Sequence, residues 1–258
     1  MAKAKIEKVK AAKPKPSKNI EPKPVKKDAA TLYLEAFKKT PDFPAKKKFA
    51  VHIVKKLKEL YPKPKCHLDV KDPFQLLVST VLAAQFRDIM VNKIMVPLYK
   101  SKYKKPKDIV DDGLENLKAN LKGVNFYNNK SANVYGLSKA IVEKHNGKVP
   151  GKMEDLIELP GVGRKSASVV LGNFFGKEDV IIVDTHLKRV SQRLGITESD
   201  DPSKIELELK ELVPENEQFH FSMRIGEHGR QICHARNPDH ENCVFKKECP
   251  YYRSVHKN

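Results

Sequence analysis

Apolar residues recur at helical spacing along this chain from about Thr31 onward. Phe49, Ile53, Leu57 and Leu60 follow one another at intervals of four, four and three residues, which places them on one face of a helix. An apolar face of this kind is typical of a helix that packs against a core. We therefore expect a helical fold after the first thirty residues.

A buried helix is predicted at Phe74–Ala84, where the chain is almost entirely apolar. Asp72-Pro73 precedes it, and proline is favoured in the first helical turn. Further helices are predicted at Ile109–Leu121, Ala132–Lys144, Met153–Leu159 and Arg164–Phe175. The β-branched run Val180–Val183 is too isolated to indicate a sheet. The predicted fold class is all-α.

Residues 1–30 differ in composition from the rest of the chain. They contain ten lysines, three acidic residues and four prolines, with few large apolar side chains. Such a segment cannot offset the entropy of ordering by burying apolar surface. We expect a disordered basic arm, which either contacts a polyanion or is a solvated extension without a specific task.

The charge balance favours a polyanionic partner. The 258 residues carry a formal charge of +18, and nucleic acid is the usual partner of such a surface, although a basic surface that serves only solubility has the same balance. Of the 50 basic residues 42 are lysine, which suits attraction to phosphates more than reading of bases. The apolar runs are too short to cross a bilayer and no secretory signal is recognisable, so no membrane partner is expected.

The segment Leu159-Pro160-Gly161-Val162-Gly163 lies between two of the predicted helices. Glycine allows a sharp turn. The N–H groups at the start of the second helix have no intrahelical partners, so they can bind a phosphate. An ordinary turn between two helices would have a similar sequence.

Two residues beyond this turn are candidates for catalysis. Lys165 lies in the first turn of the second predicted helix, where its amine can attack a sugar carbon. Asp184 follows the β-branched run and precedes Thr185-His186. An aspartate there is normally a helix N-cap, and that role is compatible with a carboxylate that also faces a cleft.

Three of the four cysteines cluster near the C-terminus with a histidine between them, in the pattern C-x6-H-x2-C-x5-C: Cys233, His240, Cys243 and Cys249. Without a secretory signal, this spacing favours a metal site over disulfides. The donors can hold zinc or iron. Alternatively, His240 is a surface residue, and Asp239 or no side chain completes the site. Cys66 is expected to be a plain thiol.

Four features together resemble the endonuclease III family of helix-hairpin-helix DNA glycosylases: Leu159–Ala167, Val183–His186, His228–Arg230 and the C-terminal ligand spacing. The likeness extends over roughly residues 31–253. It implies a bifunctional DNA glycosylase and abasic-site (AP) lyase in base excision repair. The implied substrate is double-stranded DNA with damaged bases, expected to be oxidised pyrimidines, or abasic sites. A mismatch-type glycosylase and a non-catalytic DNA-binding protein are the alternatives.

The resemblance also implies two helical domains. A six-helix, barrel-like domain with the helix-hairpin-helix would comprise residues 66–187. Residues 31–65 and 188–258 would form a second helical domain that includes the C-terminal ligand loop. The protein is expected to be a monomer, located in the cytoplasm at the nucleoid if it is bacterial and in the nucleus if it is eukaryotic.

The resemblance assigns roles to individual residues. Lys165 takes the position of the nucleophile and Asp184 that of the assisting carboxylate. The positions expected to contact DNA are Gln85, Phe126, Gly161, Gly163, Arg164 and His186. Gln85 and Phe126 would be inserted into the duplex, unless Phe126 is a core aromatic. Phe86-Arg87 departs from the small residues or threonine common in the family after this glutamine, so the lesion preference stays open.

The C-terminal loop of the family carries four cysteines that hold a [4Fe–4S] cluster. In this chain His240 occupies the second ligand position. The resemblance therefore implies a [4Fe–4S] cluster held by Cys233, His240, Cys243 and Cys249, with zinc as the second possibility.

Overall fold

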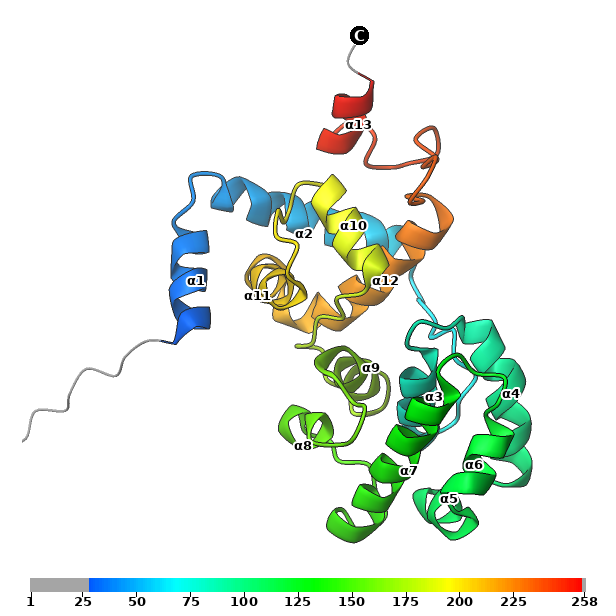
Figure 1. Cartoon of the computed structure of the whole chain (residues 1–258). Helices are drawn as coiled ribbons and strands as arrows, with labels where there is room; N and C mark the ends of the chain where they lie inside the picture. The colour runs from blue at the N-terminus through cyan, green and yellow to red at the C-terminus, as the bar shows by residue number, and fades with distance from the viewer. Residues whose placement is uncertain (1–27, 257–258) are drawn as a thin grey trace, which may run out of the picture.

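The computed structural model describes residues 28–256, which form helices and no strand (Figure 1). The first two helices are α1 (Ala29–Lys38) and α2 (Phe43–Leu60). The middle of the chain forms α3 (Pro73–Ala83), α4 (Asp88–Ser101), α5 (Pro106–Asp112), α6 (Leu114–Asn120), α7 (Tyr127–Lys144), α8 (Met153–Ile157) and α9 (Arg164–Phe174). The last part forms α10 (Thr185–Arg193), α11 (Pro202–Leu212), a 3-10 helix (Glu215–Glu217), α12 (Gln218–Gln231) and α13 (Pro250–Val255). The all-α prediction is confirmed, and none of the described helices is long and apolar enough to span a membrane.

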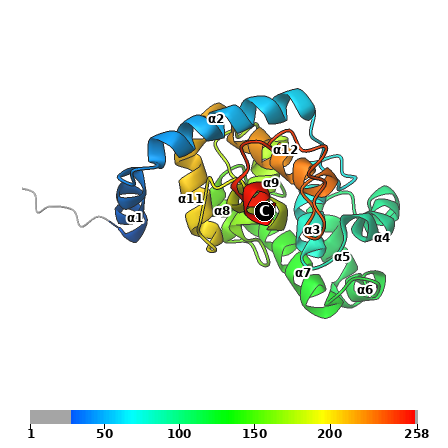
Figure 2. The ribbon, with the colours of Figure 1, turned by 90° about the horizontal axis from the view of Figure 1, so that it is seen from above.

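The helices gather into two groups, one formed by α3–α9 and the other by α1, α2 and α10–α13 (Figure 1). Seen from above, α2 runs along one side of the second group, and a non-helical segment at residues 61–72 leads from it to α3 (Figure 2). Each group has its own buried apolar cluster. The first draws on residues 68–182 and on Phe219, and the second on residues 37–57 and 181–249. This separation supports the predicted pair of domains, whose boundaries after residues 65 and 187 stay a prediction.

The β-branched run links the two clusters. Val180 and Ile182 are buried in the first cluster, whereas Ile181 is buried in the second and Val183 packs against it. Successive side chains of an extended backbone point in opposite directions. Residues 180–183 therefore connect the two apolar cores. Asp184, which follows them directly, lies where the two cores meet.

Several helix boundaries differ from the predicted ones. The helix predicted at Ile109–Leu121 is two helices, α5 and α6, because Gly113 between them has a φ of 81° that interrupts the helix. The apolar pattern did not predict α4. Residues 1–27 of the predicted basic arm lie outside the described residues. Its last three residues are the N-cap Asp28 and the start of α1, which begins at Ala29, so the arm ends earlier than predicted.

Candidate active site and C-terminal ligand loop

The turn between α8 and α9 is built around Gly161. Its φ is 75°, and a Cβ there would stand 2.7 Å from the Cβ of Asn133, so the turn requires glycine. Gly163 is the N-cap of α9, has an extended backbone and faces open space. As a glycine, this N-cap has no side chain that could cap the first N–H groups of α9. The turn can therefore receive a phosphate from the solvent side.

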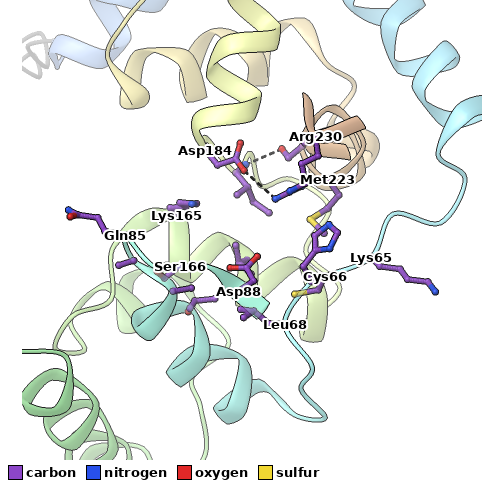
Figure 3. A pocket seen from close by; sticks show the side chains of 18 residues that line it. Lys65, Cys66, Leu68, Gln85, Asp88, Lys165, Ser166, Asp184, Met223 and Arg230 are labelled. Carbon is purple, nitrogen blue, oxygen red and sulfur yellow. Dashed lines mark hydrogen bonds and ion pairs between the residues drawn. The ribbon is translucent and has the colours of Figure 1, made fainter. Parts of the chain in front are cut away.

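Lys165 and Asp184 line the same cavity of about 250 Å³ (Figure 3). Lys165 comes from the first turn of α9, in one helical group. Asp184 is the N-cap of α10 in the other group, where its Oδ1 accepts a hydrogen bond from the N–H of Leu187 at 2.7 Å. Its Oδ2 lies 3.9 Å from Nη2 of Arg230. The cap fixes the carboxylate, and its other oxygen faces Arg230, which also lines the cavity.

The wall of this cavity includes residues outside the sequence motifs, among them Cys66, Asp88 and Met223 (Figure 3). Cys66 comes from the segment between α2 and α3, and burial raises the pKa of its thiol. It is therefore a half-buried thiol in the wall of the cavity, in line with the plain thiol expected. Because the lining residues come from segments far apart in the chain, no local spacing could have identified them.

Gln85 and Phe126 protrude from neighbouring loops. Gln85 has a φ of 53° and Phe126 a φ of 58°, a region that side-chain-bearing residues rarely adopt. The Phe126 side chain is 66% exposed, so it is not a core aromatic. Nδ2 of Asn125 donates to the carbonyl oxygen of Gln85 at 3.4 Å and connects the two loops. Only Gln85 also lines the cavity.

Arg164 is engaged by a carboxylate from the other helical group. Its Nη2 donates to Oε1 of Glu206 at 2.7 Å, and its Nε donates to Oε2 at 3.1 Å. Glu206 is buried on α11, whereas the Arg164 side chain is about half exposed. The predicted contact between Arg164 and DNA stays a prediction, and the structure gives this side chain a connecting role between the groups.

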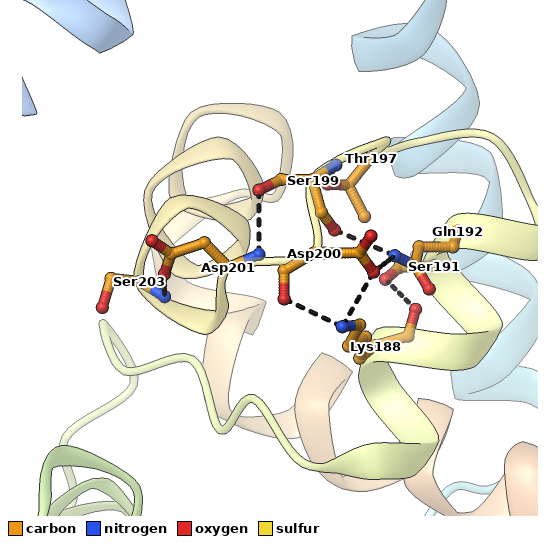
Figure 4. Close-up of polar contacts among 8 residues, drawn as sticks. All are labelled: Lys188, Ser191, Gln192, Thr197, Ser199, Asp200, Asp201 and Ser203. Carbon is orange, nitrogen blue, oxygen red and sulfur yellow. Dashed lines mark hydrogen bonds and ion pairs between the residues drawn. The ribbon is translucent and has the colours of Figure 1, made fainter.

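The loop that precedes α11, the helix that carries Glu206, is held by polar contacts (Figure 4). Nζ of Lys188 donates to the carbonyl oxygen of Asp200 at 2.8 Å and pairs with its carboxylate. Asp201 then caps α11 by accepting from the N–H of Ser203 at 2.8 Å. These contacts fix the start of α11 against α10, one turn before Glu206.

His186 lies beside the cavity but not among its lining residues. It is half-buried, its Nδ1 lies 3.2 Å from Nη2 of Arg189, and it packs closely against Gly229. Burial lowers the pKa of His186. These contacts favour a packing role, and its predicted contact with DNA stays a prediction.

The four candidate metal ligands line a second, small cavity of about 20 Å³ beside α10. Burial, together with the nearby Cys233 sulfur, raises the pKa of the Cys243 and Cys249 thiols. A bound cation reverses that effect, because it favours thiolates. Three sulfurs and an imidazole suit zinc or an iron–sulfur cluster, although no three such side chains within residues 28–256 already stand at metal-binding distances.

Aromatic rings and arginines surround this loop. The ring of His240 lies 5.1 Å from that of Tyr252 and 5.0 Å from that of His256, between centroids. Nη1 of Arg193 lies 3.3 Å from the sulfur of Cys233. Nε2 of the buried His228 lies 3.7 Å from the sulfur of Cys243. His240 thus borders the cavity while packing against the C-terminal helix.

Comparisons with known proteins agree with this geometry. Residues 78–215 match the HhH-GPD superfamily of base excision DNA repair proteins. Endonuclease III of Synechocystis sp. is 41% identical over 206 residues, which cover 80% of this chain and 94% of that protein. A non-covalent endonuclease III–DNA complex has a TM-score of 0.77 at 34% identity and covers 82% of this chain and 99% of the other. A trapped endonuclease III–DNA covalent intermediate has a TM-score of 0.76 at 34% identity, covering 81% and 98%.

Proposed function

Because this chain belongs to the endonuclease III family of base excision repair proteins, we propose that Lys165 and Asp184 carry its bifunctional DNA glycosylase and AP lyase activity. The observation that supports this assignment most directly is their position. They come from two helical groups and line one cavity, and Lys165 stands two residues after Gly163, the N-cap of the α9 helix that follows the phosphate-compatible turn. We expect this cavity to receive a nucleotide that has been rotated out of the duplex.

The proposed reaction begins with that rotation, which costs a few kcal/mol and is easiest for damaged or mispaired bases. Gln85 and Phe126 would fill the space left in the duplex, since both side chains are exposed on adjoining loops. The turn at Gly161 and Gly163 would hold a phosphate of the same strand through the N–H groups of α9.

Lys165 would then attack the sugar at C1′. The new C–N bond displaces the base, which leaves with its electron pair and takes up a proton. The sugar ring opens to a Schiff base, which acidifies the proton on C2′. Loss of that proton and cleavage of the C3′–O bond break the strand by β-elimination. Asp184 would stabilise positive charge on the sugar and assist the proton transfers.

For the C-terminal loop we propose a [4Fe–4S] cluster held by Cys233, His240, Cys243 and Cys249, with zinc as the second possibility. The donor types fit both groups, and the four side chains line one small cavity. When bound, the metal group would cross-link the loop. Basic side chains on the loop, Arg236 and Lys247 among them, would then be held at the surface for DNA.

We further propose that the substrates are oxidised pyrimidines and abasic sites in duplex DNA, handled by a monomer. Incision of end-labelled duplexes that carry an abasic site, an oxidised pyrimidine or a G·T mismatch tests this proposal. Strand cleavage at the first two, with the 3′ end that β-elimination leaves, would support it. Preference for the mismatch would favour the mismatch-type alternative, and binding without incision of any duplex would contradict the enzymatic role.

A further inference from the structure

Lys130, in the first turn of α7, has an unusual environment for a lysine. It is only 6% exposed, and lysine is rarely this buried without a partner of opposite charge. Its Nζ donates to the carbonyl oxygen of Leu82 at 2.7 Å and lies 5.5 Å from the centre of the Phe86 ring. Burial lowers the pKa of Lys130, and no acidic residue within the described range 28–256 opposes this effect. Burying an ammonium group without a carboxylate partner costs free energy, so this placement indicates a specific structural role for Lys130.

The two groups that contact this amine flank Gln85. Leu82 lies in the last turn of α3, where carbonyl groups lack intrahelical partners and carry partial negative charge. Phe86 directly follows Gln85, whose left-handed backbone is intrinsically unfavourable. The Lys130 ammonium contacts the carbonyl oxygen of Leu82 and the ring of Phe86, on either side of Gln85, and so stabilises this conformation of the loop.

The same turn of α7 also holds the second protruding loop. The N–H of Lys130 donates to the carbonyl oxygen of Phe126 at 3.1 Å, in the first hydrogen bond of the helix. Asn125 donates to the carbonyl of Gln85 across the two loops. Lys130 therefore contacts both segments, through its backbone on one side and its side chain on the other.

We propose that Lys130 is a positioning residue that joins the Gln85 and Phe126 loops into one rigid unit for insertion into duplex DNA. This role rests on the proposed function, in which those two side chains fill the space of the rotated nucleotide. A preorganised pair loses little freedom on insertion, so more of its contact energy stabilises the rotated state. The amine itself points into the protein and takes no part in bond making.

Two substrates distinguish a positioning role of Lys130 from a catalytic role. A duplex with an oxidised pyrimidine requires insertion, whereas a single strand with a preformed abasic site does not. Lys130→Met keeps an unbranched apolar chain but removes the ammonium. We expect kcat/KM on the duplex to fall by roughly 10- to 100-fold, the scale of a small misplacement of reacting groups. Cleavage of the single strand should stay within about twofold of wild type.

The matched control is Lys139→Met, which makes the same change on the exposed side of α7, where Lys139 pairs with Glu143. It should leave both substrates unaffected. Phe86→Leu is a milder second variant, which removes only the ring beneath the ammonium and should reduce duplex cleavage in the same direction. It keeps the proposal testable if Lys130→Met does not fold.

The decisive comparison adds Lys130→Met to Gln85→Ala. Because Lys130 is proposed to act through Gln85 as well as through Phe126, the combined loss on the duplex should be smaller than the product of the two single losses. Independent, multiplying losses would overturn the proposal, as would an equal loss on both substrates or an unchanged duplex rate. A wild-type protein that cleaves neither substrate would instead overturn the proposed function on which this role rests.

Discussion

Arg164 and Glu206 join the two helical groups beside the candidate nucleophile. Their two hydrogen bonds, of 2.7 and 3.1 Å, run from the first residue of α9 to a buried carboxylate on α11. Lys165 follows Arg164 directly, and Asp184 lies in the group that carries α11. The ion pair therefore helps to set the separation of the two residues proposed to carry the reaction.

We predict a measurable coupling between these partners. In a double-mutant cycle with Arg164→Met and Glu206→Gln, urea unfolding should give a coupling free energy of about 1 kcal/mol, because one partner is buried and the other half exposed. The exposed pair Lys118–Glu115 serves as the control and should couple more weakly. A coupling near zero, together with a salt dependence of DNA binding reduced by about 0.9 in slope for Arg164→Met, would show that Arg164 binds a phosphate instead.

Asp184→Asn should separate chemistry from helix capping. Asparagine caps a helix about as well as aspartate, so the thermal midpoint should change little. Loss of the negative charge should lower kcat by about 100-fold or more while DNA affinity changes far less. Asp184→Ala should add a stability loss of about 1 kcal/mol. If activity in both variants simply follows the unfolded fraction, Asp184 is only a cap.

The ligand loop can be tested by metal analysis. Protein purified without oxygen should contain iron and sulfide, and Cys243→Ser should lose both because it removes a thiolate ligand. His240→Ala should lose part or all of the iron, and His240→Cys should retain it. Cys66→Ser is the matched control, because Cys66 lines the cavity of Lys165 and Asp184 and not the cavity of the ligand loop. This variant should keep the wild-type iron and sulfide content. Zinc in place of iron would reject the cluster, whereas unchanged iron in His240→Ala would reject only this ligand.

Residues 1–27 lie outside the described part of the chain, and their composition alone supports a prediction. Removing them should weaken binding to damaged and undamaged duplexes alike, because lysines attract phosphates regardless of sequence. The slope of log affinity against log salt should decrease by about 0.9 for each phosphate that the arm neutralises. An unchanged slope would show that the arm does not bind DNA.

Local rules explain what the sequence could predict. The turn at Gly161 and the cap at Asp184 are determined by a few adjacent residues, so the sequence is enough to place both. The run Val180–Val183 stands isolated in the sequence, and its role as a connection depends on two cores that distant residues build. Helix ends are least predictable where a single residue such as Gly113 decides them.

Tertiary relationships explain what the sequence could not predict. Arg164 and Glu206 are 42 residues apart, and no periodicity connects them. Lys130 would normally be assigned to a solvated helix face, yet the turn after α3 covers it. The cavity wall formed by Cys66 and Met223 likewise depends on the way two helical groups meet.

The most direct test of this account is reduction of the enzyme–DNA intermediate with borohydride on a duplex that contains an abasic site. The wild-type protein should form a stable covalent adduct, because Schiff-base chemistry at a lysine is trapped as a secondary amine. Lys165→Gln should form none while still binding the duplex, and Lys139→Gln, which changes an exposed lysine of α7, should form the adduct as the wild type does. An adduct at wild-type level in Lys165→Gln would contradict the assignment of Lys165 as the nucleophile.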